Sequence, residues 1–237
     1  MHTTHLIHNP AGEKGVPILE AKEVTARFGS REAVIQRASF TIERGGFVFL
    51  LGPSGSGKTT LLRLLFGDIR PIEGAVFYGR INLRNMRGRR MAYYRREVSF
   101  IFQDFKLLPR RTVFENIALA LRVTGASSRT IREKVDEIIP RVGLAHRRDA
   151  YPSEISGGEQ QRVSIARAMV NEPNVLLADE PTGNLDPRMS TEILDLFEKF
   201  NFRGTTVVVA THDAAMAASR RQPILRIERR RVIEDIA

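Results

Sequence analysis

The sequence contains no cysteine, which excludes disulfides, thiolate metal sites and cysteine nucleophiles and is consistent with a reducing compartment. It also lacks any run that approaches the roughly 20 consecutive apolar residues of a membrane-spanning helix. The segment from Met1 to Val16 has no apolar core of signal-peptide length. We therefore expect a cytosolic protein that reaches a membrane only through a partner or through its surface charge.

Acidic residues are scarce relative to basic ones, because 27 Asp and Glu oppose 37 Lys and Arg and the formal net charge is +10. Most of the excess is arginine, which gathers in clusters at 84–96, 110–111, 147–148, 220–221 and 229–231. Such a balance suits nucleic acid, anionic lipid headgroups or an acidic protein surface. A solvated, arginine-rich surface explains it equally well, so the charge alone selects no partner.

The length of 237 residues and the 42% hydrophobic content fit one large α/β domain, with or without an inserted subdomain. Residues 1–17 are polar, contain Pro and Gly and show no periodicity, which predicts a flexible tail. We expect the folded domain to span 18–237.

The stretch Gly52–Thr59 reads GPSGSGKT and fits the phosphate-binding pattern G-x-x-x-x-G-K-[ST]. The apolar run Phe47–Leu51 before it predicts a buried strand, and Thr60–Phe66 after it has the apolar spacing of a helix. A strand, a Gly-rich turn and a helix N-terminus direct backbone N–H groups and the positive end of the helix dipole at one point. Lys58 would bridge the β- and γ-phosphates, and the Thr59 hydroxyl would bind Mg²⁺. The sequence therefore predicts nucleoside triphosphate binding.

Further apolar runs lie on both sides of this phosphate loop. Ile18–Phe28, Ala33–Ile35, Ala38–Ile42 and Gly74–Gly79 predict strands of an antiparallel sheet, separated by turn residues. Val175–Ala178 and Thr206–Ala210 are continuous apolar runs, as a parallel sheet covered on both faces requires. We expect an antiparallel sheet beside a parallel core.

Between about 104 and 160 the sequence becomes helical. Val113–Val123 is one amphipathic segment, and Ser127–Val142 is another, with Ser128 as its expected N-cap. These segments predict an inserted helical subdomain. Nearer the C-terminus, Arg188–Asn201 predicts a helix between the two parallel strands, and 224–233 predicts a short hairpin.

Four polar side chains follow predicted strands and have the chemistry of phosphoryl transfer. Asp179 is placed to hold Mg²⁺ through its water shell, and Glu180 beside it is placed to act as general base toward an attacking water. Gln103 is placed to contact Mg²⁺ and that water. His212 is placed to hydrogen-bond the γ-phosphate and orient Glu180. Acid pairs also occur as helix caps and a lone His is usually structural, so these assignments depend on the phosphate loop.

A second Gly-rich helix N-terminus occurs at Ser156–Gln160, before the helical run 161–169. One nucleotide does not need two such cradles from one chain, so the economical interpretation is that this one covers the γ-phosphate bound by another subunit. The alternative is a helix N-cap whose glycines allow close packing. The segment Gly183–Asp186, shortly after Glu180, is expected to place backbone across the same subunit boundary.

Together these segments resemble the ATPase subunit of ABC transporters, in the family's motif order and over nearly the whole chain from Ile18. The resemblance implies an α/β fold of the P-loop NTPase class, with a RecA-like core, an antiparallel β-subdomain and an inserted α-helical signature subdomain. It also implies hydrolysis of ATP to ADP and phosphate, a requirement for Mg²⁺, and a homodimer that forms on binding two ATP molecules head to tail. The motifs that carry it are Gly52–Thr59, Gln103, Ile155–Gln160, Leu176–Glu180, Asn184–Asp186 and His212.

The resemblance assigns roles to individual residues. Phe28 falls where the family stacks an aromatic ring on adenine, and Ile155 stands where the family usually has leucine. The predicted catalytic residues are Glu180, His212 and Gln103, and the predicted Mg²⁺ ligands are Thr59, Gln103 and Asp179. The predicted ATP-binding residues are Phe28, Gly52, Pro53, Ser54, Gly55, Ser56, Gly57, Lys58, Thr59 and Thr60. The residues predicted to contact the second subunit's ATP are Ser156, Gly157, Gly158, Glu159, Gln160 and Asp186.

Within the family, Phe102–Leu108 is similar to the corresponding segment of the ATPases that serve bacterial cell division, where ATP cycling signals to cell-wall hydrolases. That branch implies an integral membrane partner contacting the helical subdomain and the Gln103 region, a location on the cytoplasmic face of the inner membrane, and no specific nucleic acid. Glu180–Asp186 is shared with lipoprotein-release and macrolide-export ATPases, which are the alternative. A nucleic-acid ABC ATPase is more distant, because the chain lacks paired domains, coiled coils and zinc modules. A P-loop kinase would leave Ser156–Gln160 unexplained.

Overall fold

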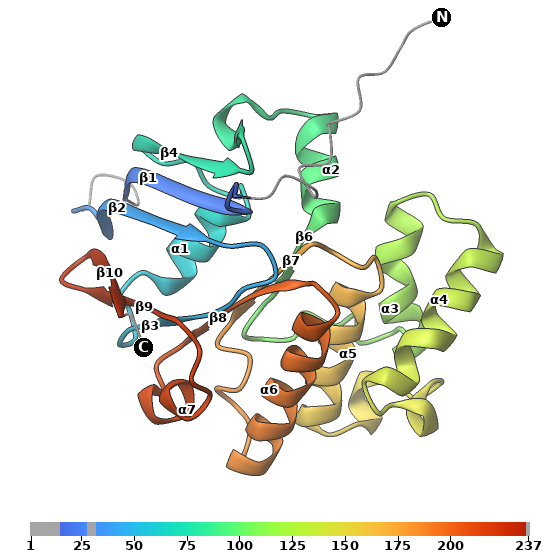
Figure 1. The fold of residues 1–237 in the computed structure, drawn as a ribbon. Helices are drawn as coiled ribbons and strands as arrows, with labels where there is room; N and C mark the ends of the chain where they lie inside the picture. Colours follow the sequence, from blue (N-terminus) through green and yellow to red (C-terminus); the bar gives the residue numbers. More distant parts are fainter. Residues whose placement is uncertain (1–14, 28–31, 236–237) are drawn as a thin grey trace, which may run out of the picture.

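The computed structural model describes residues 15–27 and 32–235, whose strands form two sheets (Figure 1). The four-stranded sheet has the order β2-β1-β4-β5, and the six-stranded sheet has the order β10-β9-β3-β8-β7-β6. The strands are β1 Leu19–Ala26, β2 Ile35–Ile42, β3 Phe47–Leu51, β4 Glu73–Tyr78, β5 Ile81–Asn82, β6 Val98–Ile101, β7 Val175–Asp179, β8 Thr206–Thr211, β9 Ile224–Glu228 and β10 Arg231–Asp235. The α-helices are α1 Lys58–Leu65, α2 Arg89–Glu97, α3 Val113–Val123, α4 Ser128–Arg141, α5 Gly157–Met169, α6 Pro187–Phe202 and α7 Ala214–Ser219.

The middle of the six-stranded sheet is parallel and buried on both faces. Every residue of β3, β7 and β8 is buried, as their continuous apolar sequences predict. Phe47 and Phe49 of β3 face a core shared with α3, α5 and α6, whereas Val48 and Leu50 face a core shared with α1 and the antiparallel sheet. The alternation of side chains along a strand thus places one hydrophobic core on each side of the sheet.

The antiparallel sheet is irregular at its centre. The pairing of β1 with both neighbours shifts register near Glu23, whose φ is 48°. Gly74 of β4 passes so close to β1 that a Cβ there would lie 2.3 Å from the carbonyl oxygens of Lys22 and Glu23. Only glycine fits this approach, which fixes the bulge opposite it.

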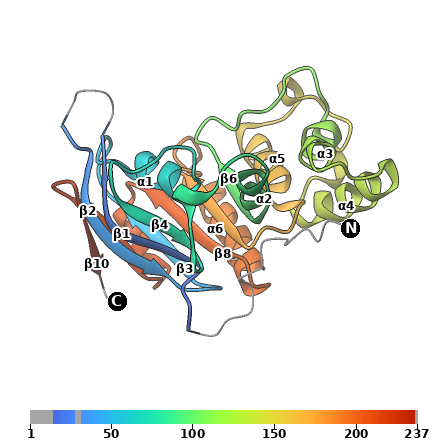
Figure 2. The ribbon, with the colours of Figure 1, turned by 90° about the horizontal axis from the view of Figure 1, so that it is seen from above.

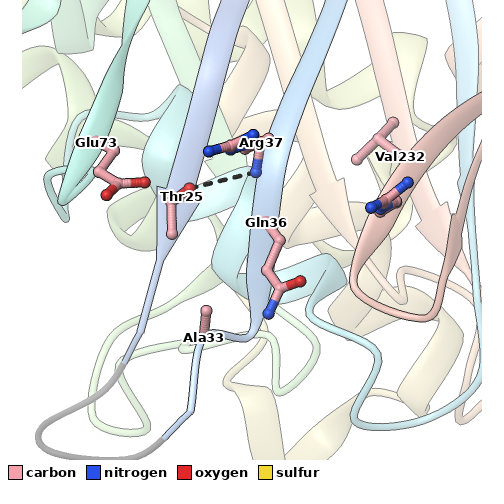
Figure 3. A pocket seen from close by; sticks show the side chains of 7 residues that line it. Thr25, Ala33, Gln36, Arg37, Glu73 and Val232 are labelled. Atoms are coloured by element: carbon pink, nitrogen blue, oxygen red, sulfur yellow. Dashed lines mark hydrogen bonds between the residues drawn. The ribbon is translucent and has the colours of Figure 1, made fainter.

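A cavity of about 610 Å³ lies where the antiparallel sheet meets the β9–β10 hairpin (Figure 3). Thr25, Gln36 and Arg37 line one side, and Val232 lines the other. The Thr25 hydroxyl accepts a hydrogen bond of 3.2 Å from the Arg37 backbone N–H. Among the described residues, none of the phosphate loop lines this cavity, although Ala33 lines both it and the cavity beside that loop.

The helices α3, α4 and α5 pack together on one side of the molecule, away from the antiparallel sheet (Figures 1 and 2). Thr112 starts α3 with a reciprocal capping box to Glu115. The prediction that Ser128 caps α4 is wrong, because the hydroxyl of Ser127 accepts the bond of 3.2 Å from the Thr130 N–H. Ser127 has extended backbone and can bend its hydroxyl onto the helix, whereas Ser128 is already helical.

Helix α2 was not predicted from the sequence, which showed only an arginine cluster there. Of its nine residues only Tyr94 is buried, and its N-cap Gly88 makes no side-chain capping bond. Neither an apolar stripe nor a start signal therefore marks this helix. The predicted C-terminal hairpin is confirmed by the antiparallel pairing of β9 with β10.

Within the described residues, no helix combines the length and the apolarity that crossing a bilayer would take. The predicted tail, apart from 15–17, and the predicted adenine-stacking Phe28 lie outside the described residues. The limits of the folded domain stay predictions.

Candidate active site

The phosphate loop Gly52–Thr59 connects the C-terminal end of β3 to the start of α1. Gly55 and Gly57 have φ angles of 77° and 108°, which favour glycine. A Cβ on Gly57 would also come within 2.9 Å of the side chains of Val34 and Ile35. No side chain caps the N-terminus of α1. The first turn of this helix therefore presents backbone N–H groups and the positive end of its dipole to the space above the loop.

Lys58 and Glu180 form a buried ion pair at this helix N-terminus. The Lys58 Nζ donates to the carbonyl oxygens of Gly52 and Pro53 at 2.7 and 3.1 Å and lies 3.1 Å from Glu180 Oε1. The other carboxylate oxygen of Glu180 lies 2.9 Å from His212 Nδ1. Lys58 and Glu180 are 6% and 11% exposed, whereas His212 is 55% exposed. One carboxylate thus joins a buried ammonium to a solvent-facing imidazole.

The backbone of Glu180 is itself unusual, with a φ of 46° in a residue that is not glycine. Such a left-handed conformation costs roughly 1 kcal/mol or more and persists only where the surroundings enforce it. Glu180 N–H donates to the carbonyl of Ala210 in β8 at 3.0 Å, which holds this turn at the sheet edge. The strain directs the carboxylate toward both Lys58 and His212.

Asp179, the last residue of β7, is 5% exposed, and its Oδ1 has no hydrogen-bond partner among the described residues. Burial raises the pKa of the Asp179 carboxyl, the Thr59 hydroxyl and the Lys58 ammonium oppose that rise, and the charge of Glu180 adds to it. A buried, unpaired carboxylate oxygen beside a hydroxyl fits the oxygen donors that Mg²⁺ prefers. The residues present are therefore suited to hold this ion.

The described residues contain no cluster of three or more His, Asp and Glu able to hold a metal by themselves.

Gln103 lies just beyond the end of β6, in an exposed loop, and makes no hydrogen bond to another described residue. Strand β6 pairs in parallel with β7, so that Ile101 stands opposite Ala178. Gln103 and Asp179 therefore come from the same edge of the sheet, on neighbouring strands. The structure places Gln103 beyond the strand next to that of Asp179, without fixing its side chain.

The second Gly-rich helix N-terminus, at the start of α5, is closed by its own side chains. The Ser156 hydroxyl accepts from the Glu159 N–H at 3.3 Å, and Glu159 Oε2 accepts from the Ser156 N–H at 2.8 Å. A Cβ on Gly158 would lie 1.4 Å from Cε of Met189, whereas a Cβ on Gly157 would meet nothing within 4 Å. Close packing thus explains Gly158, and nothing within the described part of the chain explains Gly157.

The remaining residues predicted to act on a second subunit lie apart from the phosphate loop. The Gln160 amide donates to the carbonyl of Pro152 at 3.0 Å. Asp186 is the N-cap of α6 and accepts from the Met189 N–H at 2.9 Å. Within the described residues, no hydrogen bond or ion pair joins this group to Gly52–Thr59 in the same chain.

Two cavities flank the phosphate loop and the carboxylates. One of about 600 Å³ is lined by Pro53, Gly55 and Ser56 of the loop and by the turn at 228–230. The other, of about 360 Å³, lies between His212 and Gly183 on either side of Glu180. Both open at the C-terminal edge of the parallel strands, where ligands of open α/β sheets bind.

Sequence analysis did not single out two side chains that hold the loop after Gln103. They are Asn116 of α3, which is fully buried, and Arg167 of α5. A buried Asn in an otherwise apolar helical stripe is a signal for Asn116. Arg167 is one arginine among many and carried no such signal.

The comparisons with known proteins agree with this geometry. The family model described as ABC transporter matches residues 35–183. The cell division ATP-binding protein FtsE of Streptococcus pneumoniae is 42% identical over 92% of this chain and 95% of its own length. The protein of the same name from Mycobacterium tuberculosis is 48% identical over 82% of this chain and 84% of its own.

Among solved structures, the dimeric ATP-binding cassette MJ0796, described as bound to ADP and Pi after hydrolysis, is 34% identical with a TM-score of 0.82. The match covers 92% of this chain and 97% of that one. It confirms the predicted fold class. Phosphate loop, carboxylates and chain-wide similarity lead to one conclusion: the chain belongs to the ABC transporter family as an ATP-binding subunit, and the reaction that it catalyses is ATP hydrolysis.

Proposed function

We propose that this chain is the ATPase subunit of an ABC-type membrane complex acting in bacterial cell division, of the FtsE–FtsX kind, that couples ATP cycling to septal cell-wall hydrolysis. The observation that carries the proposal is the agreement of relatives from several bacteria, which share 41–48% identity with this chain and the name of cell division ATP-binding protein. The same relatives match 82–92% of this chain, so the similarity is not confined to the phosphate loop.

The hydrolytic step belongs to Glu180 and Lys58. Glu180 takes a proton from a water molecule as its oxygen attacks the γ-phosphorus, and the bond between that phosphorus and the β–γ bridging oxygen breaks. Lys58, 3.1 Å from Glu180, neutralises negative charge on the β- and γ-phosphates. His212 holds Glu180 from the other side and donates to the γ-phosphate. The contacts of Glu180 with the buried Lys58 and the solvent-facing His212 support these roles.

Mg²⁺ would be held by Thr59, Asp179 and Gln103, and when bound it supplies charge neutralisation across the β- and γ-phosphate oxygens. The buried, unpartnered Oδ1 of Asp179 supports this assignment. Phosphate oxygens would lie against the backbone of Gly52–Thr60. Phe28 would stack on the adenine ring.

The second subunit closes the site. Ser156–Gln160 and Asp186 of one chain would contact the ATP held by the phosphate loop of its partner. Two observations on the described residues support this. No hydrogen bond or ion pair joins these residues to their own phosphate loop, and a Cβ at Gly157 would meet nothing within 4 Å. The solved dimeric relative bound to ADP and Pi supports dimerisation on nucleotide binding.

The membrane partner would be an FtsX-like permease that contacts the helical group and the loop after Gln103, which places this chain on the cytoplasmic face of the inner membrane. Exposed apolar side chains support this surface, since Phe102 and Leu108 of the loop are each 41% exposed. Apolar side chains exposed together suit a protein interface better than solvent. No specific nucleic acid partner is proposed.

Purification from membranes tests the proposal. The full chain, isolated with its membrane-bound partners from a bacterium that expresses it, is expected to carry along a permease with four membrane spans and a large extracytoplasmic loop. Recovery of a lipoprotein-release or export permease instead would overturn the cell-division role and leave the ATPase activity standing. Depletion of the chain is expected to block septation, and normal septation after depletion would contradict the proposal.

A further inference from the structure

The loop between β6 and α3, residues 102–112, is held to the helical group at its far end by one amide. Asn116 of α3 donates to the carbonyl oxygens of Leu108, Arg111 and Thr112 at 3.2, 2.9 and 3.0 Å. Its own oxygen accepts from the Leu108 N–H at 2.8 Å. The far half of the loop is therefore fixed to α3.

The near half of the same loop is held by a guanidinium from α5. Arg167 donates through Nη2 to the carbonyl of Phe105 and through Nη1 to the carbonyl of Lys106, both at 2.6 Å. Burial lowers the pKa of the Arg167 guanidinium, which forms no salt bridge within the described part of the chain. The two loop carbonyls thus compensate for the partial loss of solvation of this half-buried charge.

The backbone that Arg167 grips is strained. Phe105 and Lys106 have φ angles of 40° and 50°, and consecutive left-handed residues with side chains cost roughly 1 kcal/mol or more each. A planar guanidinium that donates two parallel hydrogen bonds fixes the direction of two successive carbonyls, which a point charge does not do. The fork of Arg167 therefore opposes relaxation of this turn.

Helix α5 also holds the other flank of Gln103. Ser99 of β6 donates its hydroxyl to the carbonyl of Ala168 at 2.7 Å, one residue beyond Arg167. Adjacent residues of one helix thus bind the chain on both sides of Gln103. Between these anchors, Phe100 and Ile101 are held by their pairing with β7, and 102–104 receive no hydrogen bond from α5.

We propose that Arg167 is a positioning residue for Gln103. Its guanidinium fixes the strained turn at 105–106, and through that turn it sets where Gln103 stands relative to the phosphates. Because Ser156 is the N-cap of α5, a shift of this helix when Ser156 meets the second subunit's nucleotide is carried to Gln103 in its own site. The inference rests on the role proposed above for Gln103 and extends it to the residue that places it.

The test is the Arg167→Lys variant of the full chain, assayed for steady-state ATP hydrolysis and for ATP binding. Lysine keeps the charge but cannot reproduce the fork. We expect kcat to fall about ten- to a hundredfold, the scale of a misplacement of about 1 Å in a catalytic group. The KM and the ATP dissociation constant should stay within about twofold, because Lys58 and the phosphate loop are unchanged.

Arg162→Lys is the matched control. Arg162 lies on the same helix, is half-buried, donates to the carbonyl of Val142 at 3.0 Å and pairs with Glu192 at 2.6 Å, but does not contact 102–112. The kcat of Arg162→Lys should stay within about twofold of the wild-type value, although its Tm should fall about as much as that of Arg167→Lys. A normal kcat for Arg167→Lys, or an equal fall of kcat in both variants, would overturn the inference.

Two further variants test the inference if Arg167→Lys does not fold and distinguish it from the role of Gln103. If Arg167→Lys does not fold, Ser99→Ala removes the other tie to α5 and is expected to lower kcat two- to tenfold, roughly the worth of one hydrogen bond, with KM unchanged. An unchanged kcat there would then refute the positioning role. Gln103→Ala distinguishes the proposed role of Gln103 from the positioning role of Arg167. Normal turnover of Gln103→Ala would refute the role of Gln103 itself. If turnover falls in Gln103→Ala but is normal in Arg167→Lys, only the positioning role of Arg167 is refuted, and the role of Gln103 stands.

Discussion

The two Gly-rich helix N-termini of this protein are built differently. The N-terminus of α1 has no side-chain cap, and the cation at its first position, Lys58, turns back to the loop carbonyls. The N-terminus of α5 is closed by a reciprocal capping box between Ser156 and Glu159. Glu159 is also held by Arg147 at 3.0 Å, and the Ser156 N–H is the first cause of the lowered pKa of its carboxyl.

The difference fits the proposed division of labour between binding and closure. An uncapped helix N-terminus gains free energy from any phosphate that approaches it. The capped one has already gained about 1 kcal/mol from its own side chains, so Ser156 must leave Glu159 before it donates to a phosphate. The loop at α1 is therefore suited to bind ATP in a single chain. The turn at α5 is suited to close over a nucleotide that another chain already holds.

The largest expected effect separates these two steps. Glu180→Gln removes the proposed base but leaves the Lys58 ammonium bonded to the loop carbonyls at 2.7 and 3.1 Å. Turnover should fall about 10²- to 10⁴-fold, the range attributed to general-base catalysis, while ATP binding persists. Size-exclusion chromatography should show a dimer in ATP and not in ADP. An undiminished ATPase rate would rule out Glu180 as the base.

Lys58→Ala attacks the binding step itself. Loss of a charged donor to phosphate is worth about 1.5–3 kcal/mol, so the ATP dissociation constant measured by calorimetry should rise about ten- to a hundredfold. Arg63→Ala on the same helix is the control, since Arg63 forms only an exposed pair with Asp68. Normal Mg-ATP binding by Lys58→Ala would show that the anchor of the phosphate loop has been misassigned.

Gly157→Ala tests closure without touching binding. A Cβ at this position meets nothing within 4 Å in its own chain, so stability and single-chain ATP affinity should be unchanged. Turnover should fall about tenfold if the methyl group crowds a second subunit's phosphate, because overpacking costs about 1–3 kcal/mol. Gly158→Ala is the contrasting variant, because its Cβ displaces Met189 and should lower Tm. Wild-type turnover in Gly157→Ala would contradict closure by a second chain.

The smallest expected effect concerns Asp179, whose pKa burial raises. A carboxyl with a raised folded-state pKa favours the folded state below its ordinary pKa, and this contribution is lost as pH rises through the raised value. Asp179→Asn should therefore stabilise the nucleotide-free protein at neutral pH and not at pH below about 3.9. Thermal unfolding at several pH values measures this. A uniform shift of Tm at every pH would contradict it.

Most of the fold followed from hydrophobic periodicity. The strands β3, β7 and β8 are buried on both faces, as their continuous apolar sequences predicted. Helix α2 could not be predicted in this way, because Tyr94 is its only buried residue and leaves no periodic apolar stripe. This helix is attached to the core through contacts with segments that are distant in sequence. The error at the start of α4 is of one residue, since two adjacent serines offer equivalent caps until the backbone selects Ser127.

The candidate site divides in the same way. The phosphate loop and the two acids at the end of β7 are local in sequence and were predicted from spacing and residue type. The neighbours that act on them are not local, because Glu180 meets Lys58 at 3.1 Å and His212 at 2.9 Å from distant segments. Arg167 is likewise distant in sequence from the loop that it holds, and its importance appears only when its two hydrogen bonds to that loop are seen.

The sequence by itself determined the chemistry, because phosphate binding depends on glycines, a lysine and a threonine that must be consecutive in the chain. It also determined the buried strands, since a strand whose side chains are apolar on both faces must bury both faces. Only the tertiary structure decided which groups share a carboxylate, which glycine is packed and which is open, and which arginine fixes the loop after Gln103. The physical reason is that these interactions join segments tens of residues apart, and pairings across such separations leave no periodicity in the sequence.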